Sequence, residues 1–369
     1  MGNVAAAEQR AVYSRLIVIH SDSDLPIYDP EPIMQAMVLE HPAAVDTSPL
    51  HMRDLALPEP TAGEVRIRVE VCGVCRTDLH VVEGELPPVQ QHLVPGHEVI
   101  GWVDKCGSGA DRFKIGTRVG AAWLFRSCGI CRYCKRGDEN LCVAPQFTGY
   151  TVNGGYAEYL TANQDFIYPI PDDVPSAEAA PFLCAGIIGY RALRRSDVAP
   201  GQPIGLYGFG ASAHIVLQIA RYWNCPVYVC TRGEKHQELA RQMGADWVGP
   251  SDARPPVELR AAILFAPAGE LVPVALEALE RGGTLALAGI YMTPIPEMDY
   301  GRCLFEERSV RSVTANTRQD GRELLDLAAR IPLRTHTVEF PLDQANEALQ
   351  ALKNDRINGA AVLRVAAPQ

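Results

Sequence analysis

In the first half of the chain, apolar and polar residues alternate over short runs that are bounded by glycines. Four runs show the pattern, EVRIRVEVCGVC at 64–75, HEVIGWVDKCG at 97–107, GTRVGA at 116–121 and AEYLTA at 157–162. A period of two residues is typical of strands that bury one face. The pattern therefore predicts a β-rich first domain.

The pattern changes after Cys184, where short apolar runs are separated by helical stretches. The apolar runs are PIGLYGFG at 203–210, PVYVCT at 226–231, AAILFAP at 261–267 and GTLALAGI at 283–290. The helical stretches include SAHIVLQIARYW at 212–223 and EKHQELARQMG at 234–244. Strands that alternate with helices predict a parallel sheet with crossover helices, so we expect an α/β chain with a doubly wound second domain.

The chain has 369 residues, which is too long for one ordinary hydrophobic core, so two domains are expected. A last strand, helix and strand, at 334–340, 342–355 and 358–365, could belong to either sheet. We divide the chain into an extension without a predicted role at 1–33, the β-rich domain at 34–184, the parallel-sheet domain at 185–325 and a return to the first domain at 326–369.

Composition and charge narrow the functional classes. No run approaches the ~18 apolar residues of a membrane span, and no basic start precedes a longer apolar stretch, so we expect a soluble, cytoplasmic protein without a membrane partner. The net charge is −10 and no basic run is present, which argues against a nucleic-acid partner. In that compartment, the eleven cysteines should be mostly reduced thiols or metal ligands rather than disulfides.

A glycine-rich turn lies between a predicted strand and a predicted helix. Gly208 and Gly210 occupy the first two glycine positions of Gly-x-Gly-x-x-Gly, and Ala213 stands at the third. A dinucleotide pyrophosphate must reach backbone N–H groups at the start of the helix, which larger side chains would prevent. A tight strand-to-helix turn without a ligand would also select glycines, but its place in a βαβ unit favours dinucleotide binding.

The residues after the second strand of this unit bear on the choice of coenzyme. An acidic residue often stands there and accepts a hydrogen bond from the ribose 2′-hydroxyl, whereas this chain has Thr231 and Arg232. Arginine can form a charge-assisted contact with a 2′-phosphate, and no acid opposes it. The pair predicts NADP, with NAD as the alternative if Arg232 is only an exposed residue at the start of a helix.

Four cysteines are concentrated in the short, charged stretch CGICRYCKRGDENLC at 128–142. Their spacing, C-x2-C-x2-C-x7-C, is typical of a structural zinc site in which protein thiolates fill all four positions. An iron–sulfur cluster is disfavoured, because the ferredoxin pattern has three residues before its last cysteine and a proline after it, whereas here there are seven residues and Val143. Disulfides are disfavoured by the expected compartment. The cysteines are Cys128, Cys131, Cys134 and Cys142.

Because that site leaves no open coordination position, chemistry must lie elsewhere, and the candidates are Cys75 in GVCRTDLH, His97 in GHE and Cys184 in FLCAG. Each alone could be an ordinary core cysteine or structural histidine. Together with the four-cysteine loop and the nucleotide turn, in this order, they resemble the zinc-dependent alcohol dehydrogenases of the medium-chain dehydrogenase/reductase superfamily. The resemblance covers roughly residues 34–369.

The resemblance implies a GroES-like catalytic domain followed by a Rossmann-type coenzyme domain. It also implies two zinc ions per chain, with Cys75, His97 and Cys184 holding the catalytic one. The other implied roles are outer coordination by Glu98, orientation of the zinc-bound histidine by Asp78, a proton relay through Thr77 and His80, and pyrophosphate contact by Arg76. Trp123 lies where the family often lines its substrate pocket, which suggests an apolar substrate, but it could equally be an ordinary core residue. This chain departs from the family in the nucleotide turn, where Ala211 and Ala213 stand at positions that are commonly glycine.

The function that follows is hydride transfer between an alcohol, or an aldehyde or ketone, and NADP or NAD. Family members are dimers or tetramers, so a homo-oligomer is expected. One alternative is a metal-independent quinone or enoyl reductase of the same superfamily, which would lack the three candidate ligands. A second is a zinc-stabilised binding or electron-carrier protein without catalysis, which would not need Thr77 and His80 at their relay spacing. The sequence does not select a particular alcohol.

Overall fold

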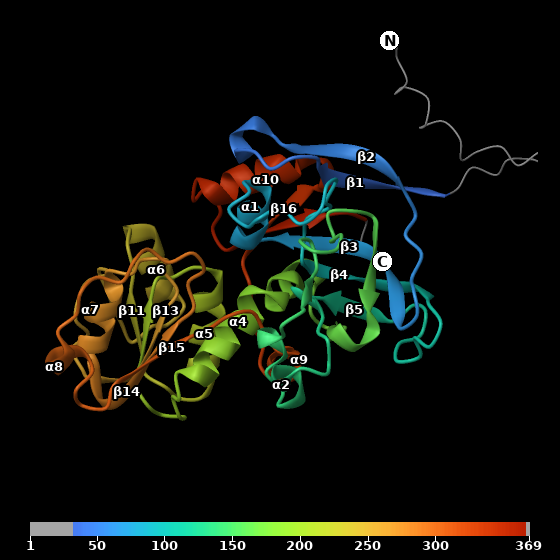
Figure 1. Cartoon of the computed structure of the whole chain (residues 1–369). Coiled ribbons are helices and arrows are strands. Elements are labelled where there is room, and N and C mark those ends of the chain that lie inside the picture. The colour runs from blue at the N-terminus through green and yellow to red at the C-terminus, as the bar shows by residue number, and fades with distance from the viewer. Residues whose placement is uncertain (1–31, 367–369) are drawn as a thin grey trace, which may run out of the picture. The chain divides into compact units, whose positions relative to one another are not determined.

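The fold was analysed in a computed structural model that describes residues 32–366 (Figure 1). The predicted extension at 1–33 lies outside the described residues as far as residue 31, and strand β1 begins at Ile33, one residue before the expected boundary. Strands β1 (Ile33–Leu39) and β2 (Leu50–Ala56) form an antiparallel pair. The sequence pattern did not predict this pair.

A seven-stranded sheet carries the first half of the chain, in the order β16-β17-β3-β4-β5-β9, with β8 paired to β3. All its pairings are antiparallel except that of β16 with β17. The strands predicted from the alternating runs are present. The bounds are β3 Glu64–Val74, β4 Glu98–Cys106, β5 Arg118–Ala121, β8 Tyr159–Asn163, β9 Ile167–Pro169, β16 Thr337–Pro341 and β17 Ala360–Arg364.

A six-stranded parallel sheet carries the second half, in the order β12-β11-β10-β13-β14-β15. The order runs outward from β10 in both directions, which is the doubly wound arrangement that the sequence predicts. The strand bounds are β10 Ile204–Tyr207, β11 Val227–Cys230, β12 Trp247–Gly249, β13 Leu259–Leu264, β14 Leu279–Leu287 and β15 Ser309–Ser312. The crossover helices include α5 Ala211–Tyr222, α6 Glu234–Gln242 and α7 Leu271–Glu277.

The remaining elements connect and cover these sheets. Strands β6 (Leu124–Arg126) and β7 (Gln146–Phe147) form a short antiparallel pair on either side of the four-cysteine loop. The other helices are α1 Arg76–Val82, α2 Arg132–Lys135, α3 Ser176–Ala179, α4 Ala185–Arg195, α8 Tyr300–Cys303, α9 Arg318–Ala328 and α10 Ala345–Lys353, with 3-10 turns η1 Val45–Thr47, η2 Glu139–Leu141, η3 Gln164–Phe166, η4 Ala180–Leu183 and η5 Leu342–Gln344. Among the described residues, none of the helices has the length and apolar character needed to cross a membrane.

The end of the chain pairs with the first half, since β17 lies antiparallel to β3 with Val362 opposite Gly73. Helix α9 (Arg318–Ala328) spans the division that we placed between residues 325 and 326. The domain boundaries remain a proposal.

One apolar cluster joins the two sheets through helices α4 and α5. It contains Val71 and Ile100 from the seven-stranded sheet, Leu193 from α4, Ile204 from β10 and Ile215 from α5. All five side chains are fully buried, so truncating any of them would leave a cavity in the core that the two sheets share. Helix α4 packs into this cluster, and Cys184 is its N-cap residue, so the packing of α4 positions Cys184.

Helix α5 also buries a histidine, which predicts an acid-sensitive fold. His214 is 5% exposed, and its Nε2 atom has no hydrogen-bond partner within residues 32–366. Burial lowers its pKa from 6.5 to about 4, so between these values the unfolded chain binds a proton that the folded chain does not. As the pH is lowered through this window, the free energy of unfolding should therefore fall by about 1.4 kcal/mol per pH unit. Denaturant titrations at pH 5 and pH 7 measure the loss, which His214→Leu should remove; an unchanged pH dependence in the variant would contradict the assignment.

Candidate functional site

The three residues proposed as catalytic metal ligands come together from separate parts of the chain. The Sγ atom of Cys75 lies 3.3 Å from Nε2 of His97 and 3.9 Å from Sγ of Cys184. With a carboxylate oxygen of Glu98, the ligand atoms all lie within 4.8 Å of one another. Two thiols and an imidazole in this arrangement are a donor set that suits zinc and leaves a fourth position for another group.

Cys75 owes its position to the junction of β3 and α1. It is the N-cap of α1, where its sulfur accepts a hydrogen bond from the backbone N–H of Thr77 at 3.2 Å. The backbone N–H of Cys75 donates in turn to Asp78 at 2.9 Å, which completes a capping box. The sequence Cys-Arg-Thr-Asp therefore encodes both the start of a helix and the orientation of a sulfur ligand.

Asp78 also fixes the ring of His97. Nδ1 of His97 lies 2.8 Å from Oδ1 of Asp78, and both side chains are 1% exposed. The carboxylate of Asp78 favours a proton on Nδ1, so Nε2 would be the nitrogen available to a metal beside Cys75. Burial raises the pKa of Asp78, and the charge of His97 opposes that effect.

Glu98 is a buried carboxyl, 2% exposed, at the first residue of β4. Its place depends on Gly73 in the neighbouring strand, because a Cβ atom added there would lie 1.9 Å from Oε2 of Glu98. Burial, reinforced by the charge of Cys75, raises the pKa of Glu98 well above its usual value. The carboxyl therefore sits beside the ligand cluster in an environment that penalises its charge.

The two sulfurs of this cluster have opposite tendencies to ionise. A hydrogen bond from the Cys184 thiol, against the effect of burial, lowers the pKa of Cys75 well below its ordinary value. The same contact, together with burial, raises the pKa of Cys184. One sulfur is thus already favoured as the thiolate that metal binding requires.

The two residues of the predicted relay lie on α1, but they differ in surroundings. Thr77 is 6% exposed, whereas the His80 side chain is 16% exposed. Nδ1 of His80 hydrogen-bonds to Glu85, and its ring stacks on Tyr291 with centroids 5.6 Å apart. Neither contact follows from the sequence, because Glu85 lies beyond the end of α1 and Tyr291 follows β14.

Trp123 lies beside the ligand cluster. Its ring meets that of His97 edge-on with centroids 5.1 Å apart, and it stacks on Phe147 at 4.8 Å and on Tyr150 at 5.9 Å. The sequence offered Trp123 as a pocket residue or an ordinary core residue, and it singled out neither Phe147 nor Tyr150. The three rings form an aromatic wall next to His97.

The four cysteines of the loop converge as a second cluster, with all four sulfurs within 4.8 Å of one another. Sγ of Cys134 lies 3.5 Å from that of Cys131 and 3.9 Å from that of Cys128. A zinc tetrahedron with arms of about 2.3 Å has edges of about 3.8 Å, so these distances suit zinc. The backbone N–H of Cys134 and other donors lower the pKa of Cys131 to about 6, while the N–H of Cys128 donates to Cys142 at 3.2 Å.

The residues of the predicted nucleotide turn lie at the carboxyl edge of the parallel sheet. Gly208 follows β10 with φ +90°, and a Cβ atom there would lie 2.8 Å from the backbone nitrogen of Ala266. Gly210 is the N-cap of α5, and open space surrounds the position of its missing Cβ. The helix then begins with Ala211, and Ala213 is fully buried. A phosphate group can thus approach the backbone at Gly210 without meeting a side chain.

Three further coenzyme candidates have distinct surroundings. Thr231 follows β11, is 4% exposed, and donates its backbone N–H to Gly249 at 3.0 Å. Arg232 is exposed between β11 and α6. Arg76, predicted to contact the pyrophosphate, donates instead to Asp355 at 2.7 Å.

Both halves of the chain match known families. Residues 61–172 match the alcohol dehydrogenase GroES-like domain, and residues 213–330 match the zinc-binding dehydrogenase family. A protein of Mycobacterium tuberculosis named as a probable alcohol dehydrogenase is 49% identical over 337 residues, which are 90% of this chain and 97% of that protein. The chain belongs to the alcohol dehydrogenases of the medium-chain dehydrogenase/reductase superfamily.

Other members of the family resemble this dehydrogenase in sequence and in fold. An alcohol dehydrogenase of Geobacillus stearothermophilus is 36% identical, over 86% of this chain and 96% of its own. The structure of a cinnamyl alcohol dehydrogenase from Sorghum bicolor has a TM-score of 0.82 at 26% identity, over 92% of this chain and 99% of its own. The structure of acetophenone reductase from Geotrichum candidum, in complex with NAD, has a TM-score of 0.80 at 27% identity, over 91% of this chain and 98% of its own. The GroES-like and Rossmann-type architecture of this dehydrogenase is thus confirmed.

Proposed function

We propose that this dehydrogenase is a zinc-dependent enzyme that transfers a hydride between an alcohol, or an aldehyde or ketone, and NADP, with NAD as the alternative coenzyme. The observation that carries the proposal is the convergence of Cys75, His97 and Cys184 around one point, with Asp78 orienting the histidine. Zinc held there would supply Lewis-acid activation of the substrate oxygen, and the nicotinamide would supply or accept the hydride. Glu98 would act in the outer coordination sphere.

The chain's own residues would bind and orient the reactants. Gly208, Gly210 and the first turn of α5, with Ala211 and Ala213, would admit the pyrophosphate to the backbone. Arg76 would contact it after leaving Asp355, while Thr231 and Arg232 would meet the adenosine end. The aromatic wall beside His97 would favour an apolar substrate and would help to exclude water from the reacting atoms.

A proton must still leave the closed site during alcohol oxidation. The Thr77 hydroxyl would accept it from the substrate while passing its own proton through the coenzyme ribose to His80, and His80 would deliver a proton to solvent, since its side chain is partly exposed. Glu85 holds Nδ1 of His80, so Nε2 would be the atom that receives the proton. Glu85 is thus a positioning residue in this scheme.

His80→Ala should slow alcohol oxidation about a hundredfold near pH 6 and only a few-fold near pH 9, where hydroxide can accept the proton directly. Steady-state rates across this range, with and without added imidazole, measure the effect. Imidazole should partly restore the rate at low pH. Equal slowing at every pH would remove His80 from the relay.

Metal analysis tests the proposal most directly. The seven cysteine and histidine ligands form two separate clusters, so two zinc ions per chain are expected. One zinc per chain, or iron in the four-cysteine loop, would contradict the two-site assignment. A panel of aliphatic, benzylic and secondary alcohols, each assayed with NADP and NAD, would identify the substrate class.

The two alternative functions predict other results. A metal-independent quinone or enoyl reductase would keep its activity after removal of the metal. A zinc-stabilised binding protein would bind zinc but transfer no hydride with any alcohol. The names of the relatives and the complete ligand set favour the dehydrogenase over both.

We also infer a homodimer or homotetramer in the cytoplasm. Strand β15 is the last strand in the order of the parallel sheet, and Tyr300 and Phe305, which precede it in the chain, are 65% and 67% exposed. A free sheet edge and exposed aromatic side chains both favour association with another copy. Light scattering would give the mass in solution, and a monomer would contradict the inference.

The thiols that both metal clusters require favour a reducing compartment.

A further inference from the structure

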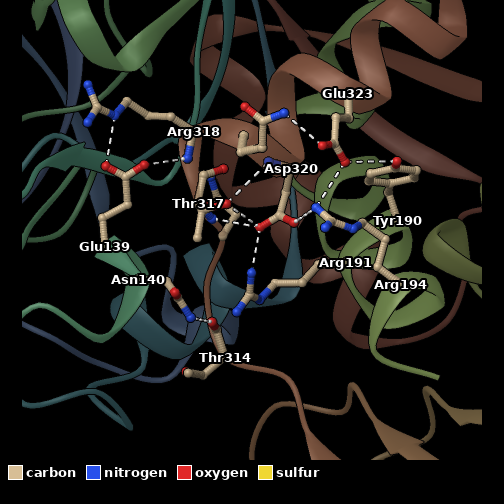
Figure 2. Close-up of polar contacts among 12 residues, drawn as sticks. Glu139, Asn140, Tyr190, Arg191, Arg194, Thr314, Thr317, Arg318, Asp320 and Glu323 are labelled. Atoms are coloured by element: carbon tan, nitrogen blue, oxygen red, sulfur yellow. Dashed lines mark hydrogen bonds and ion pairs between the residues drawn. The ribbon is translucent and has the colours of Figure 1, made fainter. Parts of the chain in front are cut away.

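The four-cysteine loop is tied to the segment after β15 by buried polar contacts (Figure 2). Glu139, 7% exposed, accepts hydrogen bonds from the backbone N–H of Arg318 at 3.0 Å and from its Nε at 2.8 Å. Asn140, 8% exposed, donates from Nδ2 to the backbone oxygen of Thr314 at 2.8 Å. Both residues belong to the turn η2, which directly precedes the ligand Cys142.

The segment at 313–317 lies where a dinucleotide is expected. It leaves the carboxyl end of β15, and the backbone N–H of Val313 donates to Leu287 at the end of β14. The carboxyl ends of parallel strands meet at one edge of a sheet, so Gly208 and Gly210 share this edge with the segment. Doubly wound sheets bind dinucleotides just outside it.

The backbone of this segment has a conformation that needs support. Ala315 has φ +46°, in the left-handed region that alanine rarely adopts. Such a residue persists only where its surroundings hold it. The bond from Asn140 acts on the carbonyl of Thr314, directly before Ala315, and Asn316 on the other side is 3% exposed.

The far end of the segment is anchored separately. Thr317 caps α9 and donates to Asp320, which is 1% exposed and pairs with Arg191 at 2.7 Å and Arg194 at 3.6 Å (Figure 2). Both arginines belong to α4, the helix that begins after Cys184. Because α9 is anchored at Asp320, a displacement of η2 would act on the residues between β15 and that anchor, which include Thr314 and Arg318.

We propose that Glu139 and Asn140 are positioning residues for the coenzyme, and that through them zinc in the four-cysteine loop strengthens coenzyme binding. The inference rests on the proposed function, since it requires zinc in the loop and a coenzyme at the sheet edge. The metal would hold Cys142, and with it η2, in the position from which Asn140 reaches Thr314 in the segment and Glu139 holds Arg318, the residue directly after the segment. Linkage makes the effect reciprocal, so bound coenzyme must strengthen zinc binding in the loop by the same factor.

The reciprocal effect can be measured on the wild-type protein. The zinc-loaded enzyme is exposed to a chelator and iodoacetamide with and without saturating NADP, and peptide mass spectrometry gives the alkylation rate of each loop cysteine. We expect NADP to slow alkylation of the four loop cysteines about five- to tenfold. Equal rates with and without NADP would overturn the proposal without the use of any variant.

Variants test the two positioning residues. Glu139→Gln and Asn140→Ala should each weaken NADP binding about five- to tenfold by calorimetric titration, and should reduce the protection of the loop cysteines. The matched control is Asp138→Asn, because Asp138 is adjacent and, in the part of the chain that the structure describes, its side chain pairs only with Arg136 inside the loop. Asp138→Asn removes one carboxylate, as Glu139→Gln does, but it should change neither NADP binding nor the protection of the loop cysteines.

The outcomes separate this inference from the proposed function. If wild-type enzyme holds two zinc ions and binds NADP, but the two variants bind NADP as the wild type does, the inference is wrong and the proposed function stands. If wild-type enzyme lacks loop zinc or binds neither NADP nor NAD, the proposed function fails and this inference fails with it. If a variant does not fold, the alkylation rates of the wild type still decide.

Discussion

Replacing Cys75 by serine should lower kcat/KM for alcohol oxidation about a thousandfold or more, with little change in thermal stability. On the proposed function, the variant removes one of three protein ligands of the catalytic metal, which would contribute several kcal/mol of transition-state stabilisation, and 1.36 kcal/mol corresponds to about tenfold in rate. The serine hydroxyl can still accept the N–H of Thr77 at the start of α1, so the helix should persist. Steady-state kinetics, metal content and a thermal melt measure the three quantities.

Cys131→Ser is the matched control, because it makes the same change in the other cluster. Helix α2 is short and has no buried residues, so the proposed zinc would contribute much of the stability of the loop around it. We expect a fall in melting temperature on the order of 10 °C, while the folded fraction retains its turnover at saturating coenzyme. Similar stability and retained turnover in both variants would contradict this division of roles.

The second large effect concerns the coenzyme. Wild-type enzyme should prefer NADP to NAD about ten- to hundredfold, because a contact between Arg232 and the 2′-phosphate contributes ~1.5 to 3 kcal/mol. Replacing Thr231 by Asp and Arg232 by Ile should reverse this preference, since the new carboxylate accepts from the ribose hydroxyl and repels the phosphate. The change should appear mainly in KM for the coenzyme, because the adenosine end is remote from the reacting carbon.

The burial of Thr231 requires a second variant in this experiment. Since Thr231 is 4% exposed, Arg232→Ile alone tests the phosphate contact without placing a carboxylate at a buried position. The single variant should lose most of the preference for NADP without reversing it. A wild-type preference for NAD, or an unmoved ratio in both variants, would show that Arg232 is only a solvated residue at the start of α6.

Local patterns predicted those parts of the fold that bury a regular face. The alternating run at 64–75 became β3, and the buried run at 203–210 became β10 followed by the nucleotide turn, because each period matches one element. The hairpin of β1 and β2 was not predicted. In β1, four consecutive buried residues end the strand, so its pattern does not alternate.

In the candidate site, the sequence predicted the candidate ligands but not the contacts that hold them or their neighbours in place. Ligands such as Cys75 and Cys142 carry their chemistry in residue type and spacing, so a sequence suffices to propose them. Contacts such as His80 with Tyr291 and Asn140 with the backbone of Thr314 join positions more than 170 residues apart. They depend on tertiary packing, and the second of them uses a backbone carbonyl that no side-chain motif can mark.

Gly73 has a consequence for the engineering of substrate range. It contributes no side chain to the site and does not have a positive φ, so neither its chemistry nor its backbone conformation marks it for attention. Yet the space that its missing Cβ leaves is occupied by the carboxyl of Glu98. A saturation library built only from residues whose side chains approach the candidate metal ligands would omit position 73, although any side chain introduced there would have to displace the carboxyl of Glu98.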